Sequence, residues 1–500
     1  MADHLIEERK KKLEALRELT NPYPHLFEPE HKAAQLLTKE VAPGEETSTQ
    51  VKVAGRIMLL RRMGKASFFH IEDGTAKIQC FISKEQVGEE QYDLFKKLEL
   101  GDFVGIEGII FATKTGELTI KTKELTVLCK AIRSIPDKYH GVKDTQIRYR
   151  KRYLDLMTNH DVRDVFRKRS IIIRTIRRYL EDKDFLEVET PTLQPIYGGA
   201  SARPFVTQHN ALNMSLYMRI SPELYLKRLL VGGFERVFEI CKNFRNEGVD
   251  ASHNPEFTML EWYMAYGDYN TGMQMFEEAV ALACKEVNNG STKVRFKEHE
   301  LDFNPPWRRA TMAELIKEHN DIDVLTMSKE ELQSFCQEKK IDCEGANSWG
   351  LLVQAVFEET CEEKIIQPTF VIDHPIETTP LCKPLRSGDA RLVERFEPFC
   401  CGMEIGNAYT ELNDPILQRK LLEDQQAILS SGDDDEAHPM DEDFLEAIDH
   451  GIPPTSGVGM GLDRITMLLT DSHSIRDVIL FPTMKPEEEK NITSEKKDNE

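Results

Sequence analysis

The sequence lacks any long apolar run, which excludes a membrane-spanning helix. Such a helix needs roughly 20 consecutive, mostly apolar residues, and no stretch of the 500 residues approaches that length. The first residues (MADHLIEERKKKLEALREL) follow an amphipathic helix pattern and lack the apolar segment of a secretory signal peptide. We therefore expect a cytoplasmic protein with no membrane partner.

Paired cysteines are missing as well. The ten cysteines form no CxxC pair and no ligand-like spacing with histidine, and Cys400 and Cys401 are adjacent. Structural zinc sites need such spacing, and disulfides persist mainly in oxidising compartments. The pattern indicates reduced thiols in a cytosolic protein.

The chain also lacks an excess of positive charge. Its net charge of −21 argues at first against a nucleic-acid partner. The charge is unevenly distributed, however: residues 1–150 hold 25 Lys and Arg against 23 Asp and Glu, and the remainder carries −23. We expect any contact with a polyanion in the first part and at its junction, where residues 138–152 (KYHGVKDTQIRYRKR) are basic.

The length predicts at least two domains, because 500 residues exceed one ordinary core. Residues 1–50 are expected to form an N-terminal helix and a linker. Residues 51–130 contain five predicted strands, with a helix-like segment between the third and fourth, which is the order of an OB-fold β-barrel. The strands are predicted at 51–60, 66–72, 77–83, 102–113 and 118–128.

The rest of the chain predicts an α+β fold. Residues 131–160 are expected to be a linker, and residues 161–486 a second domain with a helical insertion at about 294–382. The polar tail at 487–500 is expected to be disordered.

The first strands of the predicted barrel carry residues suited to single-stranded nucleic acid. Arg61, Phe68 and Gln79 fall on the usual binding face of such a barrel. Alternatively, Phe68 or Phe69 is simply part of the core. Both interpretations can hold, because adjacent strand residues point to opposite faces.

Residues 244–266 (FRNEGVDASHNPEFTMLEWYMAY) predict two strands joined by a polar loop. Phe257, Met259, Glu261 and Tyr263 share one face of the second strand. Arg245, at the end of the first, is placed to hold a phosphate or carboxylate. A pocket for a planar base beside a cationic group needs this combination.

Residues 397–414 (EPFCCGMEIGNAYTELND) contain a second candidate set. Asn407, Tyr409 and Glu411 have the same strand parity and Glu404 has the other, so a bulge or strand end between them is needed to bring all four to one cavity. Glu397 and Glu404 suit Mg²⁺, which prefers one or two carboxylates plus substrate phosphates. Taken alone, both are more often surface carboxylates.

Residues 457–464 (GVGMGLDR) form a third set. This is not a dinucleotide fingerprint, because the final glycine spacing, a following βαβ unit and a later acidic residue are absent. The alternation predicts a strand with one bare face, against which a ligand can lie flat. Arg464 then projects from the first turn of a helix and can bind outer phosphates.

Together these segments resemble the three signature motifs of class II aminoacyl-tRNA synthetases. The helix and strand ending at Pro191 resemble motif 1, FRNEG…HNPEFTMLEWY resembles motif 2, and GVGMGLDRITMLL resembles motif 3. The segments GGASARPF, RISPELYLKRL, EIGNAYTELND and IRDVILFPTMKP are similar to the bacterial-type lysyl-tRNA synthetases, and the similarity spans about residues 5–486. The resemblance implies an OB-fold anticodon-binding domain and a class II catalytic domain, with an antiparallel sheet flanked by helices.

The resemblance implies a role for most of these residues in lysine activation. Arg245 is expected to hold the ATP α-phosphate and the lysine carboxylate, and Phe257 and Arg464 to sandwich the adenine. The remaining ATP-binding residues are Glu247 on the adenine side, His253 on the triphosphate tail, and Asn254 and Glu404. Mg²⁺ is expected on Glu397 and Glu404.

For the amino acid, the resemblance implies Glu223 and the Gly199 carbonyl on the α-amino group, and Asn407 on the carboxylate. The ε-ammonium is expected at Glu411 and Tyr263, with Glu261 close by. Tyr409 completes the lysine-binding set.

The resemblance also implies a homodimer with ATP, L-lysine and tRNA(Lys) as partners. Phe68 is expected to stack on an anticodon base, and Gln79 and Glu117 to read base edges. The basic position of the family aligns with Leu60, Arg61 or Arg62; we assign Arg61.

Three alternatives remain. A lysine ligase that modifies a protein lacks the anticodon barrel predicted here. A non-catalytic nucleic-acid-binding relative requires loss of ATP-binding groups, yet Arg245, Glu404 and Arg464 are all present. An aspartate-type enzyme would need a cation facing the substrate side chain, where this sequence places acids.

Overall fold

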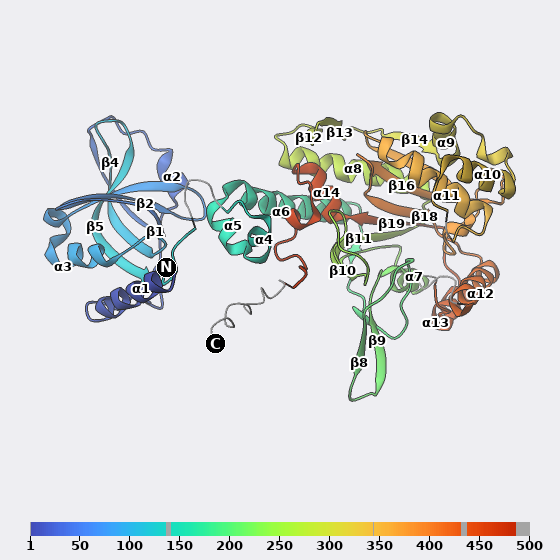
Figure 1. Ribbon diagram of the computed structural model, residues 1–500, viewed down its shortest axis with the longest axis horizontal. Helices are drawn as coiled ribbons and strands as arrows, with labels where there is room; N and C mark the ends of the chain where they lie inside the picture. Colours follow the sequence, from blue (N-terminus) through green and yellow to red (C-terminus); the bar gives the residue numbers. More distant parts are fainter. Residues whose placement is uncertain (1, 137–141, 344, 432–437, 487–500) are drawn as a thin grey trace, which may run out of the picture. The chain divides into compact units, whose positions relative to one another are not determined.

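The computed structural model divides the chain into two compact units, residues 1–143 and 144–500 (Figure 1). It describes all residues except 1, 137–141, 344, 432–437 and 487–500, so the expected disordered tail lies outside the described residues. Among the described helices, none combines the length and apolar composition that crossing a membrane requires.

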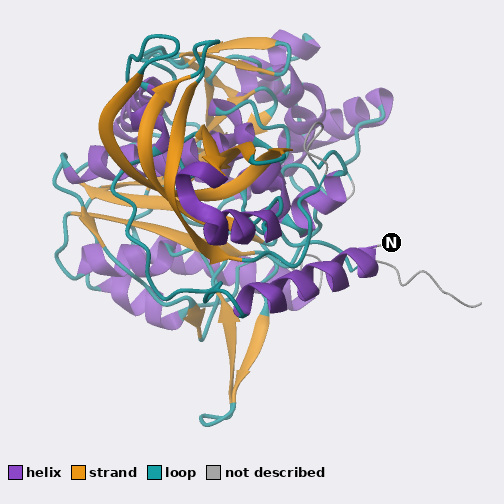
Figure 2. Cartoon of the chain, turned by 90° about the vertical axis from the view of Figure 1, so that its left-hand side faces the viewer, coloured by secondary structure: helices purple, strands orange, loops and turns teal. Residues whose placement is uncertain are grey.

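The first unit is a closed five-stranded barrel in the order β1-β2-β3-β5-β4, and Figure 2 shows its curled strands. Helix α3 lies between β3 and β4 in sequence, as predicted for an OB fold. Phe69 is fully buried in the barrel core, and Phe68 is half-buried on the opposite face. Phe69 is therefore the core residue of the pair. The elements are α1 (Ala2–Arg17), α2 (Ala33–Leu37), β1 (Glu46–Met63), β2 (Ala66–Glu72), β3 (Lys77–Ser83), α3 (Lys84–Lys97), β4 (Phe103–Ala112) and β5 (Leu118–Cys129).

The second unit is built on a nine-stranded sheet in the order β14-β15-β16-β18-β19-β11-β10-β6, with β17 paired to β16. It is antiparallel except for the β14–β15 and β10–β6 pairs. Its strands are β6 (Leu186–Glu187), β10 (Arg236–Phe244), β11 (Glu256–Ala265), β14 (Arg308–Thr311), β15 (Thr369–Pro375), β16 (Leu392–Cys400), β17 (Met403–Glu404), β18 (Gly406–Thr410) and β19 (Thr455–Gly461). Smaller sheets join β7 (Leu193–Gln194), β8 (Val206–His209) and β9 (Met214–Met218), and β12 (Lys293–Phe296) and β13 (His299–Asp302).

The two faces of the central sheet separate the core from the cavity. Leu260 and Trp262 of β11 pack with α6, α8 and α14 in the main core, whereas Tyr263 packs with α7 and α13 on the other face. This alternation follows from the period of two along a strand. The helices are α4 (Thr145–Arg150), α5 (Arg152–Thr158), α6 (His160–Glu181), α7 (Glu223–Val231), α8 (Tyr269–Val287), α9 (Met312–Asn320), η1 (Val324–Thr326), α10 (Lys329–Lys339), α11 (Trp349–Thr360), η2 (Glu362–Lys364), η3 (Ile376–Thr378), α12 (Pro415–Ser431), α13 (Glu442–Asp449), α14 (Leu462–Leu469) and α15 (Ile475–Val478).

The expected helical insertion at 294–382 is wrong at both ends. Strands β14 and β15 fall within this range, yet both belong to the central sheet. Helices α9, α10 and α11 lie between these two strands and enclose a separate apolar core. The helical insertion is therefore the segment between β14 and β15.

The expected linker at 131–160 is also too long. Residues 145–158 form α4 and α5 in the second unit. The reason is Arg152, which is fully buried: its guanidinium donates to the carbonyls of Arg476 and Leu480 and, at 2.7 Å, to the Asp155 carboxylate. This arginine of the basic run at 138–152 is consequently internal and does not face a polyanion.

Candidate functional site

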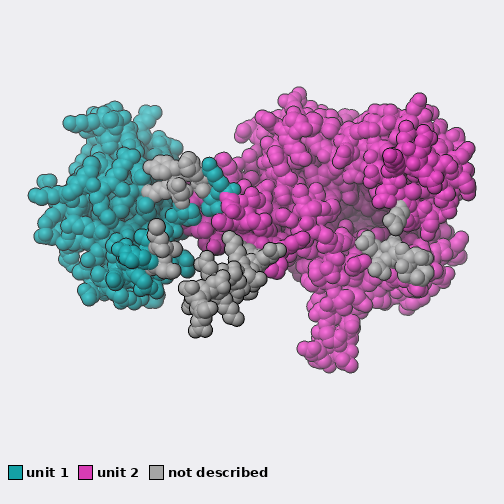
Figure 3. Space-filling view, viewed as in Figure 1, with its two compact units in different colours: residues 1–143 teal, residues 144–500 magenta. Residues whose placement is uncertain are grey.

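A cavity of about 630 Å³ opens into the second unit, which Figure 3 shows hollowed on the viewed side. Segments far apart in the sequence meet there: the β10–β11 loop, β16 to β18, β19 with α14, and the start of α7. The cavity brings together every residue predicted for ATP, metal or lysine binding: Gly199, Glu223, Arg245, Glu247, His253, Asn254, Phe257, Glu261, Tyr263, Glu397, Glu404, Asn407, Tyr409, Glu411 and Arg464.

Strand β11 contributes its predicted face to the cavity. Phe257, Met259, Glu261 and Tyr263 all line the cavity. The register pairs Glu261 with Gly459 of β19, so the glycine strand lies beside this face. The shared face predicted for these four residues is therefore confirmed.

One end of the cavity is cationic and aromatic. The Arg245 guanidinium lies 5.1 Å from the centre of the Phe257 ring, and its buried Nε has no hydrogen-bond partner in the described structure. Arg464 donates to the Glu404 carbonyl at 2.7 Å and lies 3.1 Å from His253 Nε2. The aromatic ring suits a planar base, and the cationic groups suit the phosphates that follow it in a nucleotide.

Four carboxylates lie near this end. Burial, and then the charges of Glu358, Glu404 and Glu397, raise the pKa of Glu362 to about 7. Burial and then the charge of Glu397 also raise the pKa of Glu404. The described residues hold no group of three or more ligands that could bind a metal alone. Two converging carboxylates still fit Mg²⁺, because substrate phosphates supply its other ligands.

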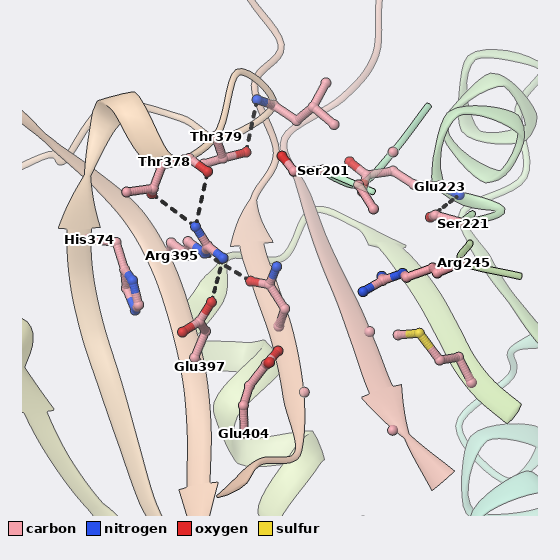
Figure 4. A pocket seen from close by; sticks show the side chains of 18 of the residues that line it. Ser201, Ser221, Glu223, Arg245, His374, Thr378, Thr379, Arg395, Glu397 and Glu404 are labelled. Atoms are coloured by element: carbon pink, nitrogen blue, oxygen red, sulfur yellow. Dashed lines mark hydrogen bonds and ion pairs between the residues drawn. The ribbon is translucent and has the colours of Figure 1, made fainter. Parts of the chain in front are cut away.

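Arg395 organises the wall between the two ends, as Figure 4 shows. It donates to Asn407 Oδ1 at 3.0 Å and to Thr378 Oγ1 at 2.9 Å, and it also pairs with Glu397. Asn407 in turn donates to the Tyr409 hydroxyl at 2.9 Å. The amide of Asn407 is thereby oriented by two partners.

The other end is acidic and closed. Glu223, Glu261 and Glu411 are 4%, 4% and 0% exposed. Ser221 donates to Glu261 at 2.8 Å and Tyr263 donates to it at 3.3 Å. Burial, and then the charge of Glu223, raises the pKa of Glu261 to about 8.

The third acid, Glu411, has a similar environment. Burial raises its pKa to about 8, although Lys227 opposes this effect. Its Oε1 has no hydrogen-bond partner in the described structure. Buried carboxylates that lack enough partners are poised to accept a cationic ligand.

Two glycines permit the close packing at this end. A Cβ on Gly457 would lie 1.9 Å from Glu411 Oε1 and 2.5 Å from a ring carbon of Tyr263. Gly199 has φ +86°, and a Cβ there would lie 2.8 Å from that of Glu223. Glycine at both positions lets the backbone approach the acids directly.

The barrel residues occupy one outward face but differ in exposure. Arg61 pairs in register with Phe68, whose ring lies 4.8 Å from that of Phe81. Gln79 is only 6% exposed and donates to Thr119 Oγ1 at 2.8 Å. Glu117 is exposed and pairs with His70 at 3.1 Å. Arg61 and Phe68 are therefore accessible, whereas Gln79 is engaged within the barrel.

Two family models match the chain. "tRNA synthetases class II (D, K and N)" matches residues 144–485, and "OB-fold nucleic acid binding domain" matches residues 51–128. The chain belongs to the class II tRNA synthetases.

Among curated relatives, the Lysine–tRNA ligase of Pelotomaculum thermopropionicum is 49% identical over 97% of this chain and 96% of its own length. That of Halalkalibacterium halodurans is 50% identical over 96% of this chain and 97% of its own length. That of Clostridium acetobutylicum is 49% identical over 97% of this chain and 94% of its own length. The resemblance, the α+β fold class and the OB-fold domain are thus confirmed.

Two cations at this class II site were not predicted from the sequence. Arg395 precedes Glu397 by two residues on β16, so the strand period was a usable signal. Lys227 follows Glu223 by four residues on α7, which places both side chains on one helix face. Arg395 lies just before the segment 397–414, whereas Lys227 lies within RISPELYLKRL but was assigned no role there.

Proposed function

We propose that this class II synthetase is a lysine–tRNA ligase. It activates L-lysine with ATP, and it transfers lysine from the adenylate to the 3′-terminal adenosine of tRNA(Lys). The observation that carries the proposal is the closed acidic end of the cavity, where Glu223, Glu261 and Glu411 are buried. The names and near-full-length identity of the relatives support the same substrate.

In the first step, a lysine carboxylate oxygen attacks the α-phosphorus of ATP, and the bond to the departing pyrophosphate breaks. Arg245 bridges the two anionic reactants and so reduces their repulsion. Phe257 and Arg464 sandwich the adenine, and Glu247 and Asn254 contact the nucleotide. His253, 3.1 Å from Arg464, holds the triphosphate tail.

Glu397 and Glu404 would hold Mg²⁺, which when bound supplies charge stabilisation to the phosphates. Glu404 is also held by Arg464, through a 3.4 Å ion pair. The chain needs no nucleophile of its own, because the lysine carboxylate attacks directly.

Lysine is recognised from both ends. Glu223 and the Gly199 carbonyl accept from the α-amino group, and Asn407 donates to the carboxylate. Glu411 and Tyr263 receive the ε-ammonium, with Glu261 and Tyr409 beside them. A site that hydrogen-bonds a polar group rejects analogues lacking it far better than an apolar contact does.

The tRNA anticodon is bound by the barrel. Phe68 stacks on a base, Arg61 attracts the backbone, and Glu117 reads a base edge. Gln79 can take part in base reading if a base displaces its contact with Thr119. The enzyme is proposed to act in the cytoplasm as a homodimer.

The function is tested by lysine-dependent ATP–pyrophosphate exchange, followed by aminoacylation of purified lysine tRNA. Omission of lysine, its replacement by aspartate, and tRNA with an altered anticodon are the controls. We expect exchange and aminoacylation only with lysine and the matching anticodon. Exchange with aspartate would indicate an aspartate enzyme, and tRNA binding without any exchange would indicate a non-catalytic relative.

A further inference from the structure

A buried lysine of the protein itself lies behind the acidic end of the cavity. Lys227 Nζ donates to Glu223 Oε1 at 2.6 Å and lies 2.5 Å from Glu411 Oε2. The Lys227 side chain is 1% exposed, and those of Glu223 and Glu411 are 6% and 0% exposed. Lys227 is absent from the described lining of the cavity, so its ammonium is not offered to a ligand.

Lys227 connects two elements that each carry a proposed lysine-binding acid. Glu223 is the first residue of α7, and Lys227 follows one turn later. Glu411 follows β18, where its amide donates to the Thr455 carbonyl at 2.8 Å. One ammonium thus fixes the spacing of the acid proposed for the α-amino group and the acid proposed for the ε-ammonium.

The charges explain why a cation is needed there. Three carboxylates are buried together, and an isolated buried carboxylate becomes protonated unless a cation compensates its charge. Burial lowers the pKa of Lys227, but the charges of Glu223 and Glu411 more than offset this and raise it above its ordinary value. Lys227 is therefore a permanent cation at this site.

We propose that Lys227 is a positioning residue that holds Glu223 and Glu411 in place and compensates part of their charge, and thereby sets the affinity of the pocket for lysine. This inference rests on the proposed function. It assigns Lys227 no contact with the substrate and no part in the chemical step.

Other charged groups surround the same acids and must be considered with Lys227. Arg395 opposes the raised pKa of Glu223, and Glu261 adds to that of Glu411. His438 lines the cavity and has a pKa lowered to about 4 by burial and by Lys227, so it is neutral at pH 7. The further titratable groups here are Tyr263, Tyr409 and Cys382, whose pKa values are all raised by burial. Arg395 is the cation among these groups, and its described hydrogen bonds go to Thr378, Glu397 and Asn407.

The test replaces Lys227 by Met, which removes the charge at similar length, and by Gln, which keeps a hydrogen-bond donor. We expect both variants to raise the KM and the calorimetric Kd for lysine at least tenfold, which is about 1.4 kcal/mol. The KM for ATP should stay within about twofold, since each buried contact acts locally. The pH at which lysine binding is half-maximal should move upward, because Lys227 lowers the pKa of both acids.

Lys130 provides a matched control in the other unit. Its side chain is 0% exposed and pairs with the equally buried Asp102 at 2.9 Å. Lys130→Met should lower the melting temperature but leave the KM for lysine and its pH profile unchanged. An equal rise in the lysine KM for Lys130→Met would indicate general destabilisation and overturn the proposal.

The remaining outcomes separate this proposal from the proposed function. Folded Lys227 variants with wild-type lysine KM and pH profile would overturn the role of Lys227 alone. Failure of both variants to fold would also overturn it, because Lys227 would then serve the fold. Wild-type protein that binds lysine without exchange would overturn only the proposed function, and wild-type protein that neither binds nor activates lysine would overturn both.

Discussion

Replacing Gly457 by alanine tests the geometry of the acidic end directly. The added Cβ would lie 1.9 Å from Glu411 Oε1 and 2.5 Å from the Tyr263 ring. Strand β19 cannot easily move away, because β11 and β18 are paired to it on both sides. We therefore expect the Glu411 carboxylate to be displaced from the pocket.

The size of the effect follows from the interaction that is lost. A hydrogen bond to a charged group contributes about 1.5–3 kcal/mol, so displacement of Glu411 should raise the KM for lysine about 10- to 150-fold. The overpacking itself should destabilise the fold by about 1–3 kcal/mol. The KM for ATP should change little, because the clash lies at the opposite end of the cavity from Arg245 and Phe257.

Gly459→Ala is the matched control on the same strand face. Its Cβ would meet the flexible end of Met259 at 3.2 Å and the Asn407 carbonyl at 3.4 Å, and no acid oxygen is among its nearest neighbours. Lysine and ATP KM values are measured for both variants by pyrophosphate exchange, together with thermal melts. If Gly457→Ala leaves the lysine KM within twofold of wild type, or if Gly459→Ala raises it equally, the assignment of Glu411 to the lysine pocket fails.

Three further predictions concern charge and tRNA. Glu411→Gln should lower lysine-dependent exchange by at least about 100-fold, because it removes the charge opposite the ε-ammonium; near-wild-type exchange would remove Glu411 from this role. Lysine binding should weaken as the pH falls below about 8, because Glu261 and Glu411 then become protonated and a cationic ligand must displace those protons. Calorimetry in buffers of different ionisation enthalpy should show proton release near pH 7, and binding independent of pH between 6 and 9 would contradict this. Phe68→Ala should raise the KM for tRNA by about 10- to 100-fold through lost stacking, with exchange unchanged; an equal loss in both assays would indicate a folding role.

Local periodicity was sufficient to predict much of the site. The face of β11 that carries Phe257, Glu261 and Tyr263 follows from a period of two, and the helix that begins at Leu462 places Arg464 at the cavity. The shared face of residues related by a strand or helix repeat can be predicted without knowing how the rest of the chain folds. Other cavity residues, such as Gly199, Glu223 and His253, were expected only from the resemblance to the class II synthetases.

Long-range pairing could not be predicted in the same way. Strand β14 has only four residues, two of them exposed arginines, and its parallel partner β15 begins after α9, α10 and α11. Such a short segment has no alternation to distinguish it from a loop. Its place in the central sheet depends on its pairing with β15 beyond the insertion. The prediction from the sequence therefore assigned this strand to the helical insertion.

The proposed choice of lysine over aspartate depends on the balance of charge at the acidic end. Glu223, Glu261 and Glu411 together carry up to three negative charges, and Lys227 supplies one positive charge from behind. Lysine brings an α-amino group and an ε-ammonium, while its carboxylate is proposed to go to Arg245. Aspartate would bring a second carboxylate to the buried acids, where no free cation faces it among the described lining residues. Burying that extra charge unpaired costs several kcal/mol, so we expect the acids to exclude aspartate even though its α-amino and carboxylate groups match those of lysine.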